Sequence, residues 1–241
     1  MADIKKAQKF IAYIKQWEGG LSKAPGDYEA RFPVPDGSGY HTNKGVTWRT
    51  FSSSAAKAGY TATPELFYKM PDDIWTKIFK VTFWDFVGAD QINSQAIAEL
   101  LVDWNWGSGP GVANKMTQRY LNSKGHALIV DGDFGAFSRK ALNAEISKRG
   151  ERAVFDDIYK LRYDFLDNLG KNTYPQFRTG WLNRMKDFYN MTVNIIQENP
   201  GKTTILGLLL VSGAVYVAWK YGSLDVFGNG ANHLKKVTPI A

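Results

Sequence analysis

Glu18 is the first residue whose type and position could do chemistry. It follows residues 4–17, whose apolar side chains recur at helical spacing, and it precedes Gly19 and Gly20, which end the expected helix. The negative end of a helix dipole and the apolar neighbour Trp17 both disfavour an ionised carboxylate, which suits a general acid. On the residues alone, an exposed acid at a helix end is the alternative interpretation.

The segment after Glu18 reads as a long loop. Residues 21–46 are rich in Gly, Pro, Ser and Asp, which favours a loop with short strands over a helix. This loop also carries Asp, Tyr, His and Thr side chains. It could therefore form the wall of a cleft and supply a second reacting group.

The remaining pattern up to residue 196 is helical. Apolar residues recur at helical spacing in several further segments, which are separated by Gly, Pro and Asp residues that interrupt helices. The predicted helices are 47–58, one starting at 71, then 92–104, 112–121, 134–148, 151–169 and 177–196. The sequence thus predicts a mainly α protein with one long loop near the start.

The C-terminal region has a different composition. Residues 203–219 contain no charged side chain, and Lys202 and Lys220 bracket them. As a helix this segment would be about 25 Å long, and the two lysines can extend it toward the ~30 Å hydrocarbon core of a bilayer. We expect one transmembrane helix here; a buried helix of a soluble protein is the alternative. Basic residues flank both sides equally, so the orientation is open.

Composition and charge exclude several classes of function. The chain has no cysteine and only three scattered histidines, so no metal or cofactor is expected. The net charge of +7 favours an anionic partner such as the bacterial wall polymer. Residues 200–241 hold four Lys and one Asp, which leaves only +4 for the rest. With no basic stripe, nucleic-acid binding is not expected.

Several motifs together resemble glycoside hydrolase family 108, a family of phage and bacterial muramidases with a lysozyme-like fold. The resemblance starts with the sequence WEGG at 17–20 and HTNKGVT at 41–47. It continues with LVDW at 101–104 and WGSG at 106–109. The sequences QRYL at 118–121, DGDFG at 131–135 and GWLNR at 180–184 resemble the peptidoglycan-binding-like segment of that family. The resemblance covers residues 8–188.

The resemblance implies roles for particular residues. Glu18 corresponds to the proton donor, and Thr42 to the threonine of the motif. The loop between them is longer than the family pattern, which leaves the second carboxylate open. Asp27 fits the Glu-to-Asp spacing of phage-type lysozymes, while Glu29 and Asp36 are alternatives.

Polar and aromatic side chains near these motifs could bind the glycan, with core packing or a place in the loop wall as the alternative. The predicted substrate-binding residues are Gly20, Tyr40, His41, Asn43, Asn105 and Trp106. Trp104 continues an apolar helical face and is expected in the core.

These observations combine into one prediction of organisation and function. We expect a lysozyme-like catalytic part at 1–88, a helical peptidoglycan-binding-like part at 89–199, and a membrane tail at 200–241. The predicted activity is hydrolysis of the N-acetylmuramic acid to N-acetylglucosamine bond, on the periplasmic side and without a signal peptide. The alternatives are a non-catalytic peptidoglycan-binding or membrane-anchored scaffold module, and a protein whose membrane span itself causes lysis.

Overall fold

The computed structural model describes residues 1–198, and helices dominate them, as predicted for the fold class. The α-helices are α1 (Gln8–Trp17), α2 (Trp48–Ser54), α3 (Pro64–Lys69), α4 (Asp72–Phe79), α5 (Gln95–Ser108), α6 (Pro110–Ser123), α7 (Ala136–Arg149), α8 (Glu151–Asn172) and α9 (Pro175–Glu198). Short 3₁₀ helices lie at η1 (Ile4–Lys6), η2 (Tyr28–Arg31) and η4 (Ala89–Gln91), and a π-helix, η3 (Lys80–Trp84), continues α4.

Local capping explains where several helices begin. Ser94 accepts a hydrogen bond from Ile97 N at 3.0 Å at the start of α5, and Thr47 caps α2 in the same way. The helix predicted over 4–17 is divided at Ala7 into η1 and α1. The break predicted between α5 and α6 falls at Gly109, whose φ is +77°.

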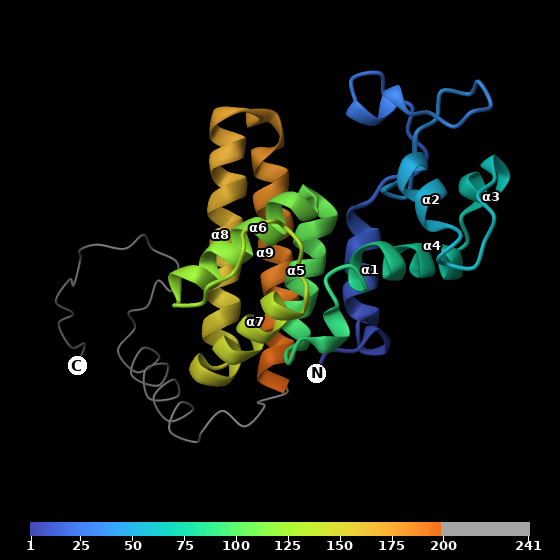
Figure 1. Cartoon of the computed structure of the whole chain (residues 1–241). Helices are drawn as coiled ribbons and strands as arrows, with labels where there is room; N and C mark the ends of the chain where they lie inside the picture. Colours follow the sequence, from blue (N-terminus) through green and yellow to red (C-terminus); the bar gives the residue numbers. More distant parts are fainter. Residues whose placement is uncertain (199–241) are drawn as a thin grey trace, which may run out of the picture. The chain divides into compact units, whose positions relative to one another are not determined.

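Figure 1 shows how these helices are arranged. Helices α8 and α9 form a long antiparallel pair, and α5 packs against α6, α8 and α9. Helices α1 to α4 and the long loop lie on the other side of α5. Because α5 has neighbours around it, every residue from Ala96 to Asn105 is buried. Polar side chains on α5 must therefore find their partners inside the protein.

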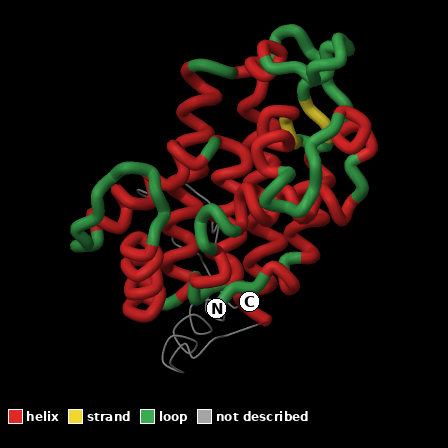
Figure 2. Tube along the Cα trace, turned by 45° about the vertical axis from the view of Figure 1, so that its right-hand side comes forward, coloured by secondary structure: helices red, strands yellow, loops and turns green. Residues whose placement is uncertain are grey.

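The long loop contains a small antiparallel hairpin, yellow in Figure 2. Strand β1 (Thr42–Asn43) pairs with β2 (Val46–Thr47), with Thr42 opposite Thr47 and Asn43 opposite Val46. The turn residues Lys44 and Gly45 have φ values of +49° and +76°. Two positive φ values are typical of the tight two-residue turns that join twisted strands.

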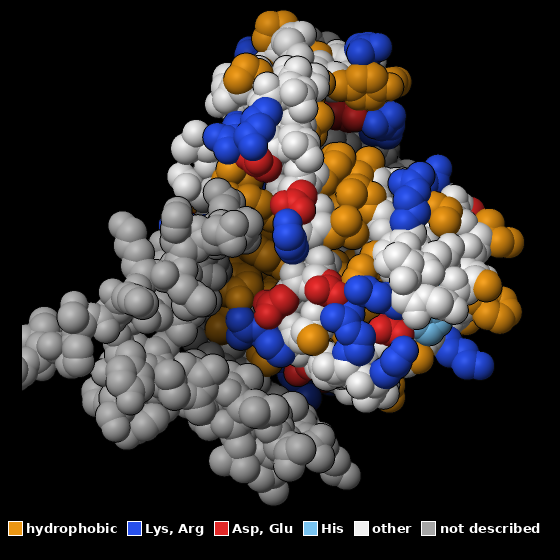
Figure 3. All heavy atoms as spheres, turned by 90° about the vertical axis from the view of Figure 1, so that its left-hand side faces the viewer, with side chains coloured by type: hydrophobic (Ala, Val, Ile, Leu, Met, Phe, Trp, Pro, Cys, Tyr) orange, Lys and Arg blue, Asp and Glu red, His pale blue; other side chains and the backbone are white. Residues whose placement is uncertain are grey.

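The surface of the described residues carries charges of both signs. On the face drawn in Figure 3, basic and acidic side chains alternate, with hydrophobic side chains between them. Helix α8 carries ion pairs between residues spaced four apart, Arg152–Asp156 and Lys160–Asp164.

The predicted membrane span at 203–219 lies outside the described residues. Within residues 1–198, no helix combines the length and the apolar character needed to cross a membrane.

Candidate active site

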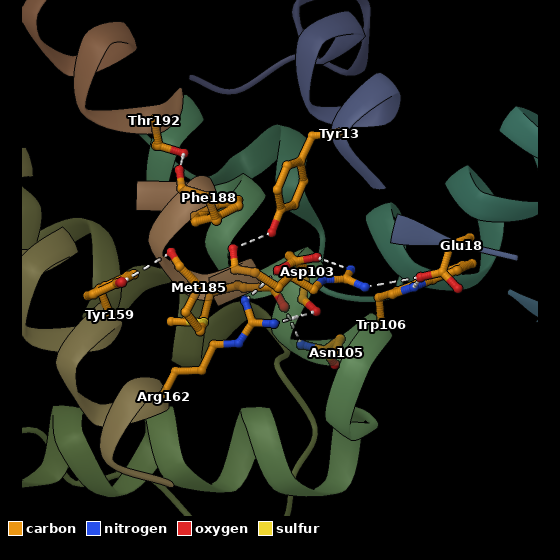
Figure 4. A network of polar contacts seen from close by, with 12 residues as sticks. Tyr13, Glu18, Asp103, Asn105, Trp106, Tyr159, Arg162, Met185, Phe188 and Thr192 are labelled. Atoms are coloured by element: carbon orange, nitrogen blue, oxygen red, sulfur yellow. Dashed lines mark hydrogen bonds and ion pairs between the residues drawn. The ribbon is translucent and has the colours of Figure 1, made fainter. Parts of the chain in front are cut away.

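Glu18 lies where α1 ends and the long loop begins. Its N–H bonds to Lys15 O at 3.3 Å, and its backbone is extended, with φ −97° and ψ 137°. The side chain turns toward α5 and α9, as Figure 4 shows for Glu18 and Trp106. Oε1 accepts from Trp106 Nε1 at 2.7 Å and from Arg184 NH1 at 3.1 Å. The side chain keeps 17% of its surface exposed, so the carboxyl is held firmly but remains within reach of solvent.

The hairpin turn packs directly on this carboxyl. A Cβ built on Gly45 would lie 2.3 Å from Glu18 Oε2 and 2.6 Å from Trp106 Cζ2. A larger residue here would have to displace Glu18 or Trp106 and adopt a φ of +76°, so this position strongly favours glycine. By contrast, a Cβ at Gly19 or Gly20 would meet nothing within 4 Å. The glycine that shapes the site is therefore Gly45.

An aromatic cluster holds Trp106 in place. The ring of Trp106 lies 4.9 Å from Phe83, 5.5 Å from Phe79 and 5.7 Å from Trp75, measured between ring centroids. Trp75 also donates its Nε1–H to Lys44 O in the hairpin turn at 2.9 Å. One cluster thus fixes both the donor to Glu18 and the turn that packs on Glu18.

Behind Glu18 lies a buried ion cluster centred on Asp103 of α5. Arg184 NH2 binds Asp103 Oδ1 at 2.8 Å, and Arg162 NH1 binds Oδ2 at 2.6 Å. Burial opposes the ionised form of Asp103, but the two guanidiniums outweigh it and hold its pKa below the ordinary value. Burial likewise opposes the charge on Arg184, yet the nearby Asp103 carboxylate raises its pKa. Tyr13 adds a hydrogen bond from its hydroxyl to Arg184 O at 2.7 Å.

His41 and Thr42 fasten the start of the loop to the hairpin. His41 is fully buried; its Nδ1 lies 2.9 Å from Thr42 Oγ1 and its Nε2 lies 3.3 Å from Ala24 O. Ser22 N donates to Thr42 O at 2.9 Å. In this structure His41 orients Thr42 and the 22–24 segment and presents no surface to a ligand.

Two asparagines predicted to bind substrate are also buried. Asn43 is 3% exposed and donates both side-chain bonds to backbone carbonyls of α3. Asn105 is 1% exposed and donates to Leu101 O and to Asn114 Oδ1, which joins α5 to α6. Like His41, they hold the scaffold of the site and do not line its surface.

Tyr40 is partly exposed and Gly20 is exposed. The ring of Tyr40 lies 5.9 Å from that of Tyr68, with Lys23 Nζ 5.2 Å from its centroid. Trp104, expected in the core, is fully buried.

The three candidate second carboxylates differ in how strongly they are engaged. Glu29 pairs with Arg49 at 2.5 Å, and its side chain is 14% exposed. Asp36 accepts from the Tyr68 hydroxyl at 2.5 Å and from a backbone N–H at 2.9 Å. These hydrogen bonds hold the pKa of Asp36 below its usual value. Asp27 is exposed and caps η2 through a bond from Glu29 N at 3.1 Å.

Sequence reasoning missed the ion cluster behind Glu18. Asp103 and Arg184 both lie in quoted motifs, but nothing local in the sequence assigned them roles. A charged residue inside the otherwise apolar run of α5 was the available signal for Asp103. Arg162 carried no comparable signal, because α8 holds many charged residues. Within residues 1–198, no cluster of His, Asp and Glu is suited to hold a metal ion.

Comparisons with known proteins agree with this arrangement. Residues 11–109 match the family model described as glycosyl hydrolase 108, and residues 112–186 match one described as predicted peptidoglycan domain. The fold is similar to the solved structure of Brucella abortus SagA, with a TM-score of 0.58 and 22% identity. That likeness covers 80% of this chain and 96% of the other. No curated protein matches the sequence. Residues 11–109 thus match the glycosyl hydrolase 108 family model, and the segment that follows them matches the model of a predicted peptidoglycan domain.

Proposed function

We propose that this protein is a peptidoglycan hydrolase of the lysozyme type, an N-acetylmuramidase that cleaves the bond between N-acetylmuramic acid and N-acetylglucosamine. The family match over residues 11–109 supports a glycosidase, and the match over residues 112–186 supports peptidoglycan as the substrate. The observation that carries the proposal is the environment of Glu18. A partly exposed carboxyl is held between an indole N–H, a guanidinium and the Gly45 turn.

Glu18 acts as the general acid. Both hydrogen bonds that it accepts from the described residues reach Oε1, so the transferable proton belongs on Oε2. As the proton moves to the glycosidic oxygen, negative charge develops on the Glu18 carboxyl. Trp106 Nε1–H and Arg184 already point at that charge, so they stabilise it as it forms.

Asp27 acts as the second carboxylate. Its side chain is exposed and, among residues 1–198, engaged only as a helix cap, whereas Glu29 and Asp36 are committed to Arg49 and Tyr68. An ionised carboxylate there stabilises the oxocarbenium-like transition state, activates water or attacks the sugar directly. Analysis of the anomer released first distinguishes a retaining from an inverting reaction.

Thr42 and Tyr40 complete the proposed glycan-facing surface. Thr42 is fixed through His41 and lies on the hairpin that packs against Glu18. The partly exposed ring of Tyr40 offers an apolar face on which a sugar can pack. Gly20 leaves open space beside the acid.

The direct test compares the wild type with Glu18→Gln as full-length proteins on Gram-negative peptidoglycan. Turbidity loss and muropeptide mass spectrometry report cleavage, and thermal unfolding checks that the variant is folded. We expect new reducing ends at muramic acid from the wild type only. Cleavage by neither protein, with both sedimenting with the wall, would favour the non-catalytic binding module.

Residues 203–219 would anchor the enzyme near the wall. Their uncharged composition and the flanking Lys202 and Lys220 support this part of the proposal. Flotation of the full chain with lipid vesicles tests it, beside a variant carrying Leu209→Asp and Val215→Asp. We expect only the wild type to float, while both cleave peptidoglycan in solution. Equal flotation would remove the anchor but leave the hydrolase proposal intact.

A further inference from the structure

A cavity of about 320 Å³ lies between the end of α5 and the helices α6, α8 and α9. Arg184, whose NH1 binds Glu18 Oε1, is also one of its lining residues. The wall comes from both family segments, because Gly107 and Ser108 end α5 while the other lining residues belong to α6, α8 and α9. Both matched segments therefore line the cavity, and Arg184 connects it to Glu18.

The lining combines two fixed cations with apolar surface. Arg162 and Arg184 supply the guanidiniums, and Phe165 and Trp181 supply aromatic walls. A cavity of this kind selects a ligand that has an apolar body and one anionic group. Guanidinium forks match carboxylates in particular.

Both arginines retain unused hydrogen-bond donors. Arg162 Nε and Arg184 Nε are buried and have no hydrogen-bond partner among residues 1–198. Arg162 as a whole is only 2% exposed. A buried donor without a hydrogen-bond partner is energetically unfavourable. Binding of a ligand is therefore favoured if a ligand oxygen can accept from this donor after a small shift of the guanidinium.

The charges of the cluster balance in only one protonation state. Arg162 and Arg184 contribute two positive charges, and Asp103 with ionised Glu18 contributes two negative charges. When Glu18 carries the proton that a general acid needs, the cluster has one excess positive charge. An anion in the cavity then restores neutrality.

Neighbouring charged groups do not change this count. The Nζ of Lys44, in the hairpin turn, donates a hydrogen bond to a backbone carbonyl and forms an ion pair with Asp72. Lys15 of α1 also pairs with Asp72, at 3.2 Å. Tyr13 uses its hydroxyl on the backbone carbonyl of Arg184, and burial, its largest influence, raises the pKa of this hydroxyl and keeps it neutral.

We infer that this cavity binds a carboxylate of the peptidoglycan substrate, whose charge balances the ion cluster when Glu18 is protonated while Arg184 still faces Glu18. Substrate binding is then coupled to uptake of the proton that Glu18 donates. The inference rests on the proposed function and adds to it a charge-specific subsite. The carboxylate comes either from the lactyl group of muramic acid or from a stem peptide, and the two sources share one chemistry.

Binding to a catalytically inactive protein tests the subsite without relying on turnover. Full-length Glu18→Gln is titrated calorimetrically with three ligands: the GlcNAc–MurNAc disaccharide, the same disaccharide carrying its stem peptide, and neutral di-N-acetylchitobiose. We expect at least about tenfold tighter binding of one carboxylate ligand than of the neutral one, as for charge-assisted hydrogen bonds. The better of the two acidic ligands identifies the source of the carboxylate.

Ser108 offers a matched pair of variants inside the cavity. Its side chain is partly buried on the cavity wall. In the Glu18→Gln background, Ser108→Glu supplies an internal carboxylate, and Ser108→Gln has the same size without charge. We expect the first to abolish the preference for acidic ligands and the second to retain it. Because the readout is a ratio of two dissociation constants, a general loss of folded protein does not imitate it.

The proton coupling has its own measurement. Titration of the wild type with the better of the two acidic ligands, in buffers of different ionisation enthalpy, reports proton uptake. We expect net uptake by the wild type near neutral pH and none by Glu18→Gln. Equal binding of acidic and neutral ligands, or identical behaviour of Ser108→Glu and Ser108→Gln, would overturn the inference. Cleavage that still depends on Glu18 would then leave the hydrolase proposal standing.

Discussion

Arg184 of α9 reaches Glu18 at the end of α1, with NH1 3.1 Å from Oε1, although 166 residues separate them in the chain. The same guanidinium binds Asp103 at 2.8 Å. The carboxyl proposed as the general acid is therefore oriented by an arginine from the segment that matches a predicted peptidoglycan domain.

Replacing Arg184 tests this link. Arg184→Met removes the charge that faces Glu18 and leaves Asp103 paired with Arg162 alone. We expect kcat to fall by roughly 10²-fold, the size of effect seen when a preorganised donor is lost, and the free energy of unfolding to fall by about 1–3 kcal/mol. Arg184→Lys keeps the charge without the fork and should recover stability more than activity. Full activity of the Met variant would contradict the role.

Gly45 permits a test with a matched control. Gly45→Ala places a methyl group against Glu18 and Trp106, whereas Gly39 has nearly the same φ, +78°, with nothing within 4 Å of the added Cβ. Gly39→Ala should cost only the left-handed backbone strain, roughly 1–2 kcal/mol, and retain activity. Gly45→Ala should have the same strain cost and should also lose most of its activity. Steady-state kinetics and thermal unfolding of both variants separate the two effects, and equal activities would show that the close approach is unimportant.

Trp106→Phe removes one hydrogen bond and retains an aromatic ring. The ring can still pack on Phe79 and Phe83, while the donor to Glu18 Oε1 is lost. We expect kcat to fall by about tenfold, the equivalent of roughly 1–1.5 kcal/mol for one hydrogen bond, with little change in KM. A change confined to KM would instead assign Trp106 to substrate binding.

The second carboxylate is tested by three substitutions measured together. Asp27→Asn should reduce kcat by at least roughly 10²-fold, because its exposed carboxylate is proposed to act on the sugar. Asp36→Asn should disturb mainly the bond to Tyr68, and Glu29→Gln mainly the ion pair with Arg49. Their thermal stabilities should therefore change more than their activities. If Asp36→Asn is instead the inactive protein, Asp36 takes over the role.

Glu99 predicts a pH dependence of stability that is separate from catalysis. Burial in α5 raises the pKa of this carboxyl from 4.5 to about 8, opposed only by a hydrogen bond from Gln95. The folded state therefore holds a proton that the unfolded state releases above about pH 4.5, so unfolding becomes easier as the pH rises from there to 8. The slope is about 1.4 kcal/mol per pH unit, and the loss is complete above the folded pKa.

Urea unfolding of Glu99→Gln beside the wild type measures this contribution. The variant should lack the fall in the free energy of unfolding that Glu99 causes as the pH rises. Relative to the wild type, the variant should therefore become progressively more stable from pH 5 to pH 8. Glu65→Gln, at an exposed ion pair on α3, provides the control and should run parallel to the wild type. A difference that stays constant with pH would mean that Glu99 is not neutral in the folded state.

Local patterns predicted most helices but not the contacts that complete the site. The segments predicted at 134–148 and 151–169 lie within one to three residues of α7 and α8, because their periodicity and flanking glycines are local signals. Helix α3 was missed, although Thr63 and Pro64 form a typical helix start, because it is only six residues long.

Residue type alone did not predict which site residues are buried and which remain available to a ligand. His41 and Asn43 are polar loop residues that look available to a ligand, yet the fold buries both against backbone carbonyls. The pairing of Glu18 with Arg184 depends on how α1, α5 and α9 pack. No local pattern encodes a contact across 166 residues.

The position of Arg184 near the end of α9 also has a consequence for biosynthesis. A ribosome makes Glu18, the Gly45 turn and Trp106 well before it makes α9. Until α9 has emerged and docked, the carboxyl lacks its cation and Asp103 lacks one of its two partners. The nascent chain thus carries an unfinished centre for most of its synthesis, and the last described helix to leave the ribosome completes it.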